Sequence, residues 1–136
     1  MVSNVIDFNV ASIFERVAQN VPDREAIICG DARLTYGEFD KRANRIAHYL
    51  ASVGIKKGDH VAIYAFNRLE WVEAMLACYK LCAVPVNVNY RYVEDELQYL
   101  LNDADVKAIV FEQQFGPLLA AIKQKLPTLK HYIAME

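Results

Sequence analysis

The sequence predicts an α/β fold: a mostly parallel sheet with helices on both faces, preceded by a helix and a small β-hairpin. From Val61 onward, strand and helix patterns alternate to the end of the chain, which is typical of parallel strands joined by right-handed crossovers. The stretch 60–66 is almost continuously apolar, as expected for a strand covered on both faces. Earlier in the chain, two short strand patterns flank a turn at 30–31, which indicates a hairpin.

The first segment is expected to be a helix that leads into this hairpin. Asn9 can cap a helix with apolar residues at helical spacing, and Pro22 ends it. A strand is predicted at 26–29, and the chain returns through 33–35 after the two-residue turn.

A second helix follows the hairpin directly. Thr35 and Glu38 have the spacing of a capping box, in which each side chain bonds the backbone amide of the other residue. Gly54 is well placed to end the helix in a left-handed conformation. The face expected to pack inward carries Phe39, Ala43, Ile46, Ala47 and Leu50.

The strand at 60–66 is followed by Asn67, which we expect to cap a third helix. Its sequence between Trp71 and Val84 is apolar nearly all round, except for Glu73 and Lys80, so the helix should be buried. Trp71, Tyr79 and Tyr99 are all expected at core positions on helices.

Three more strands and two more helices are predicted after this helix. Pro85 belongs near the start of the strand at 83–88, since proline cannot donate a ladder hydrogen bond. The next helix should bury Val93, Leu97, Leu100, Leu101 and Ala104, with the acidic residues 94–96 in its first turn, where the helix dipole favours negative charge. The remaining patterns are a strand at 108–111, a helix at 115–126 with Pro117 in its first turn, and a strand at 132–135.

Composition limits the functions that this chain can have. Its 136 residues suit one domain, and 15 basic against 17 acidic residues give a net charge of −2, which favours neither nucleic acid nor an anionic membrane. Residues 1–7 lack the charged and apolar regions expected of a signal peptide, and no apolar run approaches the roughly 18 residues that span a bilayer. Cys29, Cys78 and Cys82 have no framework spacing, so we expect reduced thiols in a cytoplasmic protein.

The carboxyl ends of the strands are where an open parallel sheet binds ligands. Neither a glycine-rich dinucleotide loop nor a phosphate loop occurs in the sequence. The stretch NVNYRY at 87–92 could line a pocket with its amides, phenols and guanidinium, or its asparagines and arginine could simply cap the loop and the helix behind it. We favour the capping interpretation, since such residues are common at these junctions.

The cysteines and histidines offer no site that the sequence can complete. Cys78 and Cys82 are four residues apart on a helix and could share a zinc ion, but nearby ligands are missing, so buried thiols are the favoured interpretation. His48, His60 and His131 are scattered without a nucleophile beside them. We therefore expect no catalytic, cofactor-binding or metal-ligating residue in this chain.

Several stretches together resemble a known family. LTYGEF at 34–39 with RANRIA at 42–47, GDHVAI at 58–63, and AVPVNVNYRY at 83–92 with ELQYL at 96–100 resemble the opening of AMP-forming acyl-CoA synthetases. The order and spacing fit over about residues 10–135, and the similarity is nearest to bacterial fatty-acyl-CoA synthetases, including those that act on sterol side-chain acids.

The resemblance implies that residues 1–136 are the amino-terminal part of a large AMP-binding domain, without its phosphate-loop region and carboxy-terminal domain. Members of this family join a carboxylic acid to ATP with the help of Mg²⁺ and then transfer the acyl group to coenzyme A. The parent protein would thus be an acid–CoA ligase, and this fragment alone would be inactive. In the family this portion supports the main domain and can contribute to homodimer contacts.

Two other hypotheses remain open at this point. The chain could be a stand-alone α/β binding or interaction module, or the front of a related adenylating enzyme that does not use coenzyme A. Acyl-chain length, pathway and the acceptor of the acyl group cannot be derived from these residues.

Overall fold

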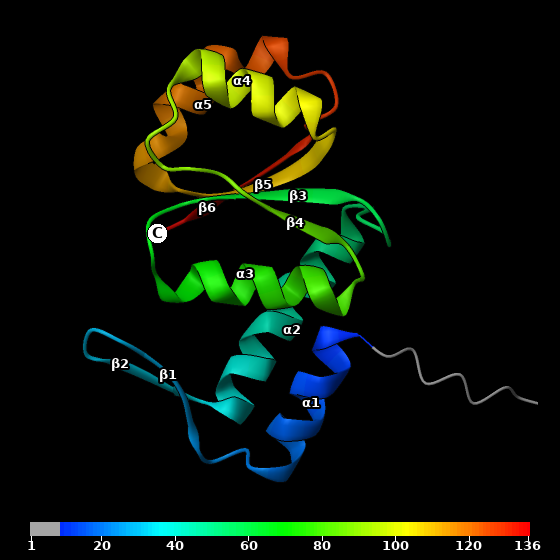
Figure 1. The fold of residues 1–136 in the computed structure, drawn as a ribbon, viewed down its shortest axis with the longest axis vertical. Coiled ribbons are helices and arrows are strands. Elements are labelled where there is room, and N and C mark those ends of the chain that lie inside the picture. Colours follow the sequence, from blue (N-terminus) through cyan, green and yellow to red (C-terminus); the bar gives the residue numbers. More distant parts are fainter. Residues whose placement is uncertain (1–8) are drawn as a thin grey trace, which may run out of the picture.

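A four-stranded parallel sheet forms the centre of the structure, a computed structural model that describes residues 9–136 (Figure 1). In spatial order its strands are β4 (Val84–Asn87), β3 (His60–Tyr64), β5 (Val106–Glu112) and β6 (His131–Met135), all parallel. Pro85 lies in the edge strand β4, where a missing amide costs no ladder bond. The mostly parallel sheet predicted from the sequence is therefore confirmed.

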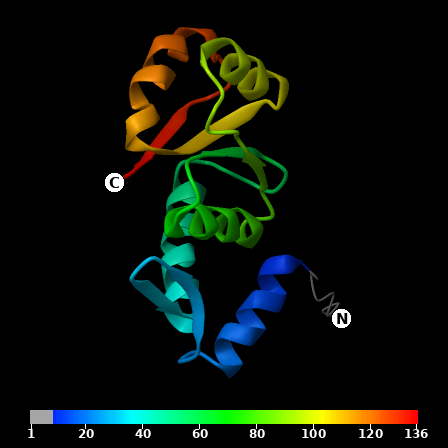
Figure 2. The same ribbon diagram turned by 60° about the vertical axis from the view of Figure 1, so that its left-hand side comes forward.

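Helices cover both faces of this sheet. Helices α2 (Tyr36–Ser52) and α3 (Leu69–Lys80) pack on one face, and α4 (Glu94–Asp103) and α5 (Gly116–Ile122) pack on the other. Figure 2 shows these layers from a second direction, with α4 and α5 above the sheet and α3 below it. Pro117 lies in the first turn of α5, as expected. Within residues 9–136, no helix has the length and hydropathy needed to cross a bilayer.

Alternation along β3 divides the interior into two cores. Successive side chains of a strand point to opposite faces, so Val61 and Ile63 join the core under α2 and α3. Ala62 and Tyr64 join the core under α4 and α5. None of these four residues is more than 1% exposed, which confirms that the strand is covered on both faces.

The amino-terminal part forms a third, smaller core beneath α3. Helix α1 (Val10–Asn20) and the hairpin of β1 (Glu25–Cys29) and β2 (Ala32–Thr35) pack against α2 and α3. The ring of Phe14 meets the ring of Phe39 edge-on, with 5.1 Å between the ring centroids. The helix and hairpin expected before the sheet are thus both present.

Short polar signals fix the ends of these elements as the sequence predicts. The side chain of Asn9 accepts a hydrogen bond from the amide of Ser12 at 2.9 Å. Thr35 and Glu38 form the predicted capping box at the start of α2. Gly54 follows α2 with a φ of +93°, a left-handed conformation that favours glycine. Two 3₁₀ segments, η1 (Gln113–Phe115) and η2 (Lys123–Lys125), flank α5.

Three local predictions are wrong. Asn67 does not cap α3; Arg68 occupies the cap position and makes no side-chain cap bond. Val93 is 60% exposed because it precedes α4 and lies outside its helical repeat. Tyr99 is 70% exposed rather than in the core, because it lies two positions, about 200° of helix rotation, from the buried Leu97.

Two of the three charged residues of α3, Glu73 and Lys80, have side chains that are largely shielded from solvent and paired. Glu73 is 2% exposed and accepts hydrogen bonds from the Nε and Nη2 atoms of Arg42 on α2. These bonds raise the pKa of Arg42. The Lys80 side chain, 6% exposed, donates to Glu15 on α1 at 2.5 Å and to Asp40 on α2 at 2.8 Å. These pairs join α1, α2 and α3.

Substitution of Arg42 and substitution of Glu73 should lower the free energy of unfolding by unequal amounts. Arg42→Met leaves a carboxylate buried without a partner, and we expect it to lower the free energy of unfolding by about 3–5 kcal/mol. Glu73→Gln should cost less, because the Arg42 side chain is 42% exposed and can be hydrated. Urea unfolding followed by circular dichroism measures both values. An equal or larger loss for Glu73→Gln would contradict this interpretation.

Burial also makes one cysteine inert. Cys78 is fully buried, and desolvation raises the pKa of its thiol to about 12, against about 8.5 for a free thiol. At pH 8, iodoacetamide should therefore modify Cys78 only after unfolding, as read by mass spectrometry. The pKa of the Cys78 thiol is higher in the folded chain than in the unfolded chain. Its ionisation therefore lowers the free energy of unfolding as the pH rises from about 8.5 towards 12. Rapid modification of Cys78 in the folded chain would show that the core opens locally.

Candidate functional site

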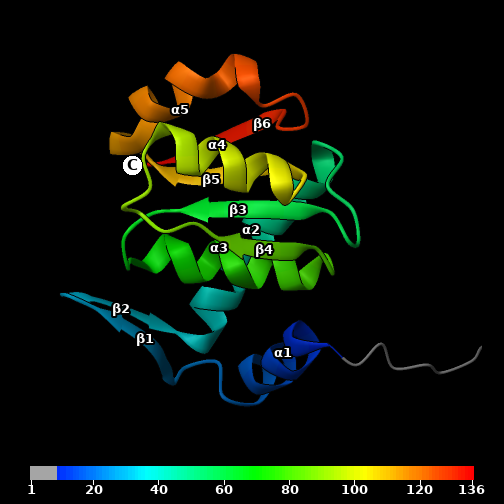
Figure 3. The same ribbon diagram turned by 45° about the horizontal axis from the view of Figure 1, so that its top comes forward.

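The carboxyl ends of the four parallel strands lie along one edge of the sheet, which we call the carboxyl edge. In Figure 3 the arrow of β3 points towards this edge, where the end of the chain also lies. Ligands of open α/β sheets bind in the crevice outside such an edge. Two hollows are found here, one on each side of the segment that leaves β3.

The first hollow lies between the start of α3 and the connection from β4 to α4. Its volume is about 490 Å³. Amide side chains and aromatic rings together form the wall, so it can offer both hydrogen bonds and flat apolar surface to a ligand. The lining residues are Ala65, Asn67, Trp71, Asn87, Val88, Asn89, Tyr90, Tyr92 and Leu100.

Both interpretations of the stretch 87–92 are correct for part of it. Asn89 stabilises its own loop: its side-chain oxygen accepts from the amide of Arg91 at 3.0 Å, and its carbonyl accepts from the amide of Tyr92. The capping interpretation is thereby confirmed for the loop, but not for α4, whose cap position is occupied by Val93 without a side-chain cap bond. Asn87, Asn89 and Tyr90 also line the hollow. Arg91 does not line it, and its guanidinium lies 5.7 Å from the ring centroid of Tyr90.

A buried tyrosine fixes this loop to the sheet. Tyr64, the last residue of β3, is 1% exposed and donates a hydrogen bond from its hydroxyl to the carbonyl oxygen of Tyr92 at 2.9 Å. Desolvation raises the pKa of Tyr64, so the hydroxyl stays protonated and remains a donor. The ring of Tyr64 also stacks on Phe115 of η1, with 4.2 Å between centroids.

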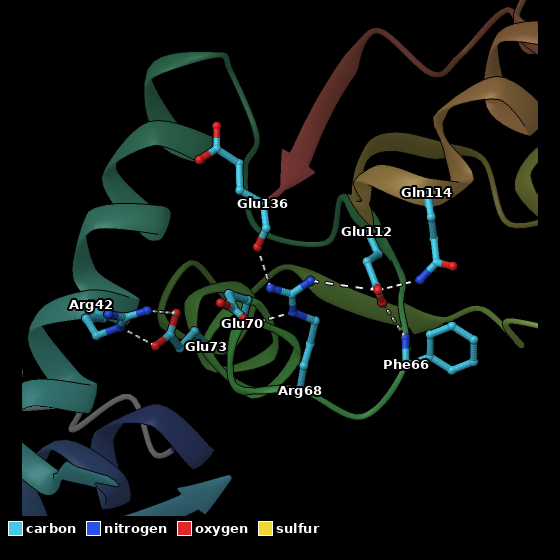
Figure 4. Close-up of polar contacts among 8 residues, drawn as sticks. All are labelled: Arg42, Phe66, Arg68, Glu70, Glu73, Glu112, Gln114 and Glu136. Atoms are coloured by element: carbon cyan, nitrogen blue, oxygen red, sulfur yellow. Dashed lines mark hydrogen bonds and ion pairs between the residues drawn. The ribbon is translucent and has the colours of Figure 1, made fainter. Parts of the chain in front are cut away.

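The second hollow surrounds Arg68 and has a volume of about 430 Å³. It lies between the tip of the β1–β2 hairpin and the ends of β3 and β5. Figure 4 shows the Arg68 side chain pointing to Glu70, Glu112 and Glu136. The pKa of Arg68 is raised and that of Glu70 is lowered, in both cases chiefly by the hydrogen bond between them. The lining residues are Cys29, Ala32, Phe66, Asn67, Arg68, Leu69, Glu70 and Glu112.

The histidines and cysteines do not lie together in a cluster that could react. His48 is exposed on α2, and His60 and His131 begin β3 and β6, at the sheet edge opposite the carboxyl edge. Cys78 is buried in α3, as expected. The prediction that Cys82 shares this helix is wrong: α3 ends at Lys80, and Cys82 is only partly buried, with its sulfur accepting from Asn9 at 3.5 Å. Among residues 9–136 there is no cluster of three His, Cys, Asp or Glu side chains able to hold a metal ion.

The carboxyl edge of residues 9–136 is lined by groups suited to binding a ligand. Its amides, phenols and rings can orient a ligand. Sequence reasoning located the stretch 87–92 but missed the contributions of Asn67 and Trp71, which come from another crossover. It also missed the partners of Arg68, because no local pattern relates Arg68 to Glu112 or Glu136.

Comparison with known proteins gives consistent matches. The family described as AMP-binding enzyme matches residues 14–136. A medium/long-chain-fatty-acid–CoA/3-oxocholest-4-en-26-oate–CoA ligase of Mycobacterium marinum is 42% identical over 131 residues, which make up 96% of this chain and 24% of that protein. A 3-oxocholest-4-en-26-oate–CoA ligase of Rhodococcus rhodochrous is 40% identical over 128 residues, covering 94% of this chain and 23% of that protein. The chain thus spans about a quarter of these relatives.

Solved structures agree with the fold. A structure titled as a putative long-chain-fatty-acid CoA ligase from Rhodopseudomonas palustris superposes with a TM-score of 0.90 and 31% identity, covering 96% of this chain and 33% of that one. The amino-terminal domain of FACL13 from Mycobacterium tuberculosis gives a TM-score of 0.88 and 29% identity, covering 93% and 33%.

Removal of the Tyr64 hydroxyl should loosen the wall of the first hollow. Tyr64→Phe deletes one hydrogen bond and leaves the Tyr92 carbonyl without its donor, so we expect a loss of about 1 kcal/mol in the free energy of unfolding. Amides at 89–93 should exchange with deuterium faster, as measured by mass spectrometry. Tyr99→Phe is the matched control, since Tyr99 is 70% exposed. Equal exchange in the two variants would contradict the role given to Tyr64.

Proposed function

Because this chain belongs to the AMP-binding enzyme family, we propose that the complete protein is an AMP-forming acid–CoA ligase. The reaction has two steps. A carboxylate attacks the α-phosphate of ATP, giving an acyl-adenylate and pyrophosphate; the thiol of coenzyme A then takes the acyl group and releases AMP. The observation that carries the proposal is the 42% identity to a fatty-acid–CoA ligase over 96% of this chain.

A fatty acid is the substrate class that we propose. Ligases with 40–44% identity to this chain are named for medium/long-chain fatty acids or for 3-oxocholest-4-en-26-oate. Both kinds of acid place a carboxylate at the end of a large apolar body. The same names support the proposal that the acyl group is transferred to coenzyme A rather than to a carrier protein. We further propose that the enzyme works in the cytoplasm and can form homodimers.

In this proposal residues 1–136 form the amino-terminal part of the large domain and supply half of its sheet. The two hollows at the carboxyl edge would contribute walls to the ligand crevice. The carboxylates beside the second hollow, Glu70 and Glu112, are already bonded to Arg68. The described residues therefore do not fit a site for the Mg²⁺ that such a reaction uses, and catalytic groups are expected outside 1–136.

The products distinguish this reaction from other uses of ATP. The complete protein, given decanoate, coenzyme A and MgATP, should form AMP, pyrophosphate and decanoyl-CoA in equal amounts, as measured by liquid chromatography with mass spectrometry. Formation of ADP and phosphate instead would contradict the proposal. Release of AMP without a thioester would favour a related adenylating enzyme with another acceptor.

The 136-residue chain by itself serves as a second test. It should show neither turnover nor heat of ATP binding by titration calorimetry, since its sequence contains no phosphate loop. Stoichiometric ATP binding by this chain would place nucleotide-binding groups within residues 1–136, contrary to the proposal.

A further inference from the structure

Asn67 lies between the two hollows of the carboxyl edge. Of the residues within 9–136 that line these hollows, only Asn67 belongs to both. It stands in the crossover that leaves β3, directly before Arg68 at the cap position of α3. Asn67 is exposed, and within residues 9–136 its side chain forms no hydrogen bond. Its carboxamide therefore keeps both a donor and an acceptor for a ligand.

A carboxylate on a different strand fixes the backbone beside Asn67. The side chain of Glu112, at the end of β5, accepts a hydrogen bond from the amide of Phe66 at 3.1 Å (Figure 4). The same carboxylate accepts from the side chain of Gln114 and lies 3.9 Å from the Nη1 atom of Arg68. Glu112 makes no side-chain cap bond to its own segment η1. It therefore holds the residues on both sides of Asn67 instead.

The charges around Asn67 disfavour an anionic ligand group. No charged side chain is found among the residues that line the first hollow. The second hollow is lined by one guanidinium and two carboxylates, and Arg68 is paired with Glu70 at 2.7 Å and with Glu112 at 3.9 Å. A phosphate or carboxylate placed here would face an excess of negative charge and be repelled. A hydroxyl, an amide or a ring nitrogen instead matches the neutral carboxamide of Asn67.

We propose that Asn67 binds an uncharged polar group of a nucleotide-bearing substrate, and that Glu112 is the positioning residue that holds Asn67 in place. This inference rests on the proposed function, whose substrates are a fatty acid, ATP and coenzyme A. The fatty acid has only a charged carboxylate and an apolar chain. Hydroxyls and ring nitrogens are present in both ATP and coenzyme A, so these two substrates share the chemistry that Asn67 recognises.

Kinetics of the complete protein test the contact and distinguish its two sources. Asn67→Ala should lower kcat/KM for ATP or for coenzyme A by about 5- to 10-fold, as for one lost hydrogen bond. The KM for decanoate should not change. Because the Asn67 side chain is exposed and unbonded, the melting temperature should stay within about 2 °C of the wild-type value. Unchanged kcat/KM for both nucleotide substrates, or a change confined to decanoate, overturns the inference.

A second exposed asparagine provides the matched control. Asn20 lies at the carboxyl-terminal end of α1, outside both hollows. Asn20→Ala should keep kcat/KM for all three substrates within about twofold, as for a surface substitution. A loss in Asn20→Ala as large as that in Asn67→Ala would show that the effect does not depend on the carboxyl edge, and would overturn the inference.

Substitution of Glu112 tests the positioning role. Glu112→Leu removes the acceptor of the Phe66 amide, so the amides at 66–68 should exchange faster with deuterium, and kcat/KM should fall for the same substrate as in Asn67→Ala. Glu112→Gln should recover much of both losses, since its carboxamide oxygen can still accept from that amide. The Asn67→Ala/Glu112→Leu double variant should lose no more than the more impaired single variant, because the two residues act as one unit. Losses that multiply, or exchange that is unchanged in Glu112→Leu, refute the positioning role.

The two proposals can fail separately. If the wild-type protein makes no acyl-CoA, the proposed function fails and this inference fails with it. If the wild type is active and Asn67→Ala keeps full kcat/KM for ATP and coenzyme A, the ligase function stands and the role of Asn67 is refuted.

Discussion

Burial of β3 on both faces is the constraint on which the rest of the structure depends. Its residues Val61, Ala62, Ile63 and Tyr64 are at most 1% exposed and point alternately into two different cores. A strand of this kind is stable only if helices cover both faces of the sheet. The crossovers α3 and α4, which join the parallel strands, provide this cover on opposite faces.

Charges inside the amino-terminal half determine how its helices fit together. Lys80 forms ion pairs with Glu15 and Asp40, and Glu73 forms one with Arg42, so ion pairs connect α3 to both α1 and α2. Buried ion pairs add little net stability, because desolvation offsets their attraction. Their consequence here is geometric, since another packing of these helices would leave a charge in the apolar interior without a partner.

The carboxyl edge carries two different kinds of polar surface. The described residues supply a binding wall of amides and rings on one side of β3 and an ion-pair network on the other. They place no cluster of metal ligands there. The chain belongs to the AMP-binding enzyme family and spans about a quarter of the relatives that it matches.

The sequence alone determined the features that depend on neighbouring residues. Asn9, the Thr35–Glu38 box and Gly54 fix the ends of helices through contacts within a few positions. The apolar patterns predicted the order of α-helices and strands but not the two 3₁₀ segments that flank α5. The resemblance to acyl-CoA synthetases rested on similarly short stretches.

Tertiary structure decided everything that joins distant positions. These features are the strand order, the hollow shared by two crossovers, and the partners of the buried charges, which lie 31 residues apart for Arg42 and Glu73 and 68 apart for Arg68 and Glu136. A local pattern cannot specify such pairs, because each depends on how whole helices and strands pack. Arg68 illustrates the difference: its sequence suggested an ordinary helix start, and only the fold brought the ends of β5 and β6 to its side chain.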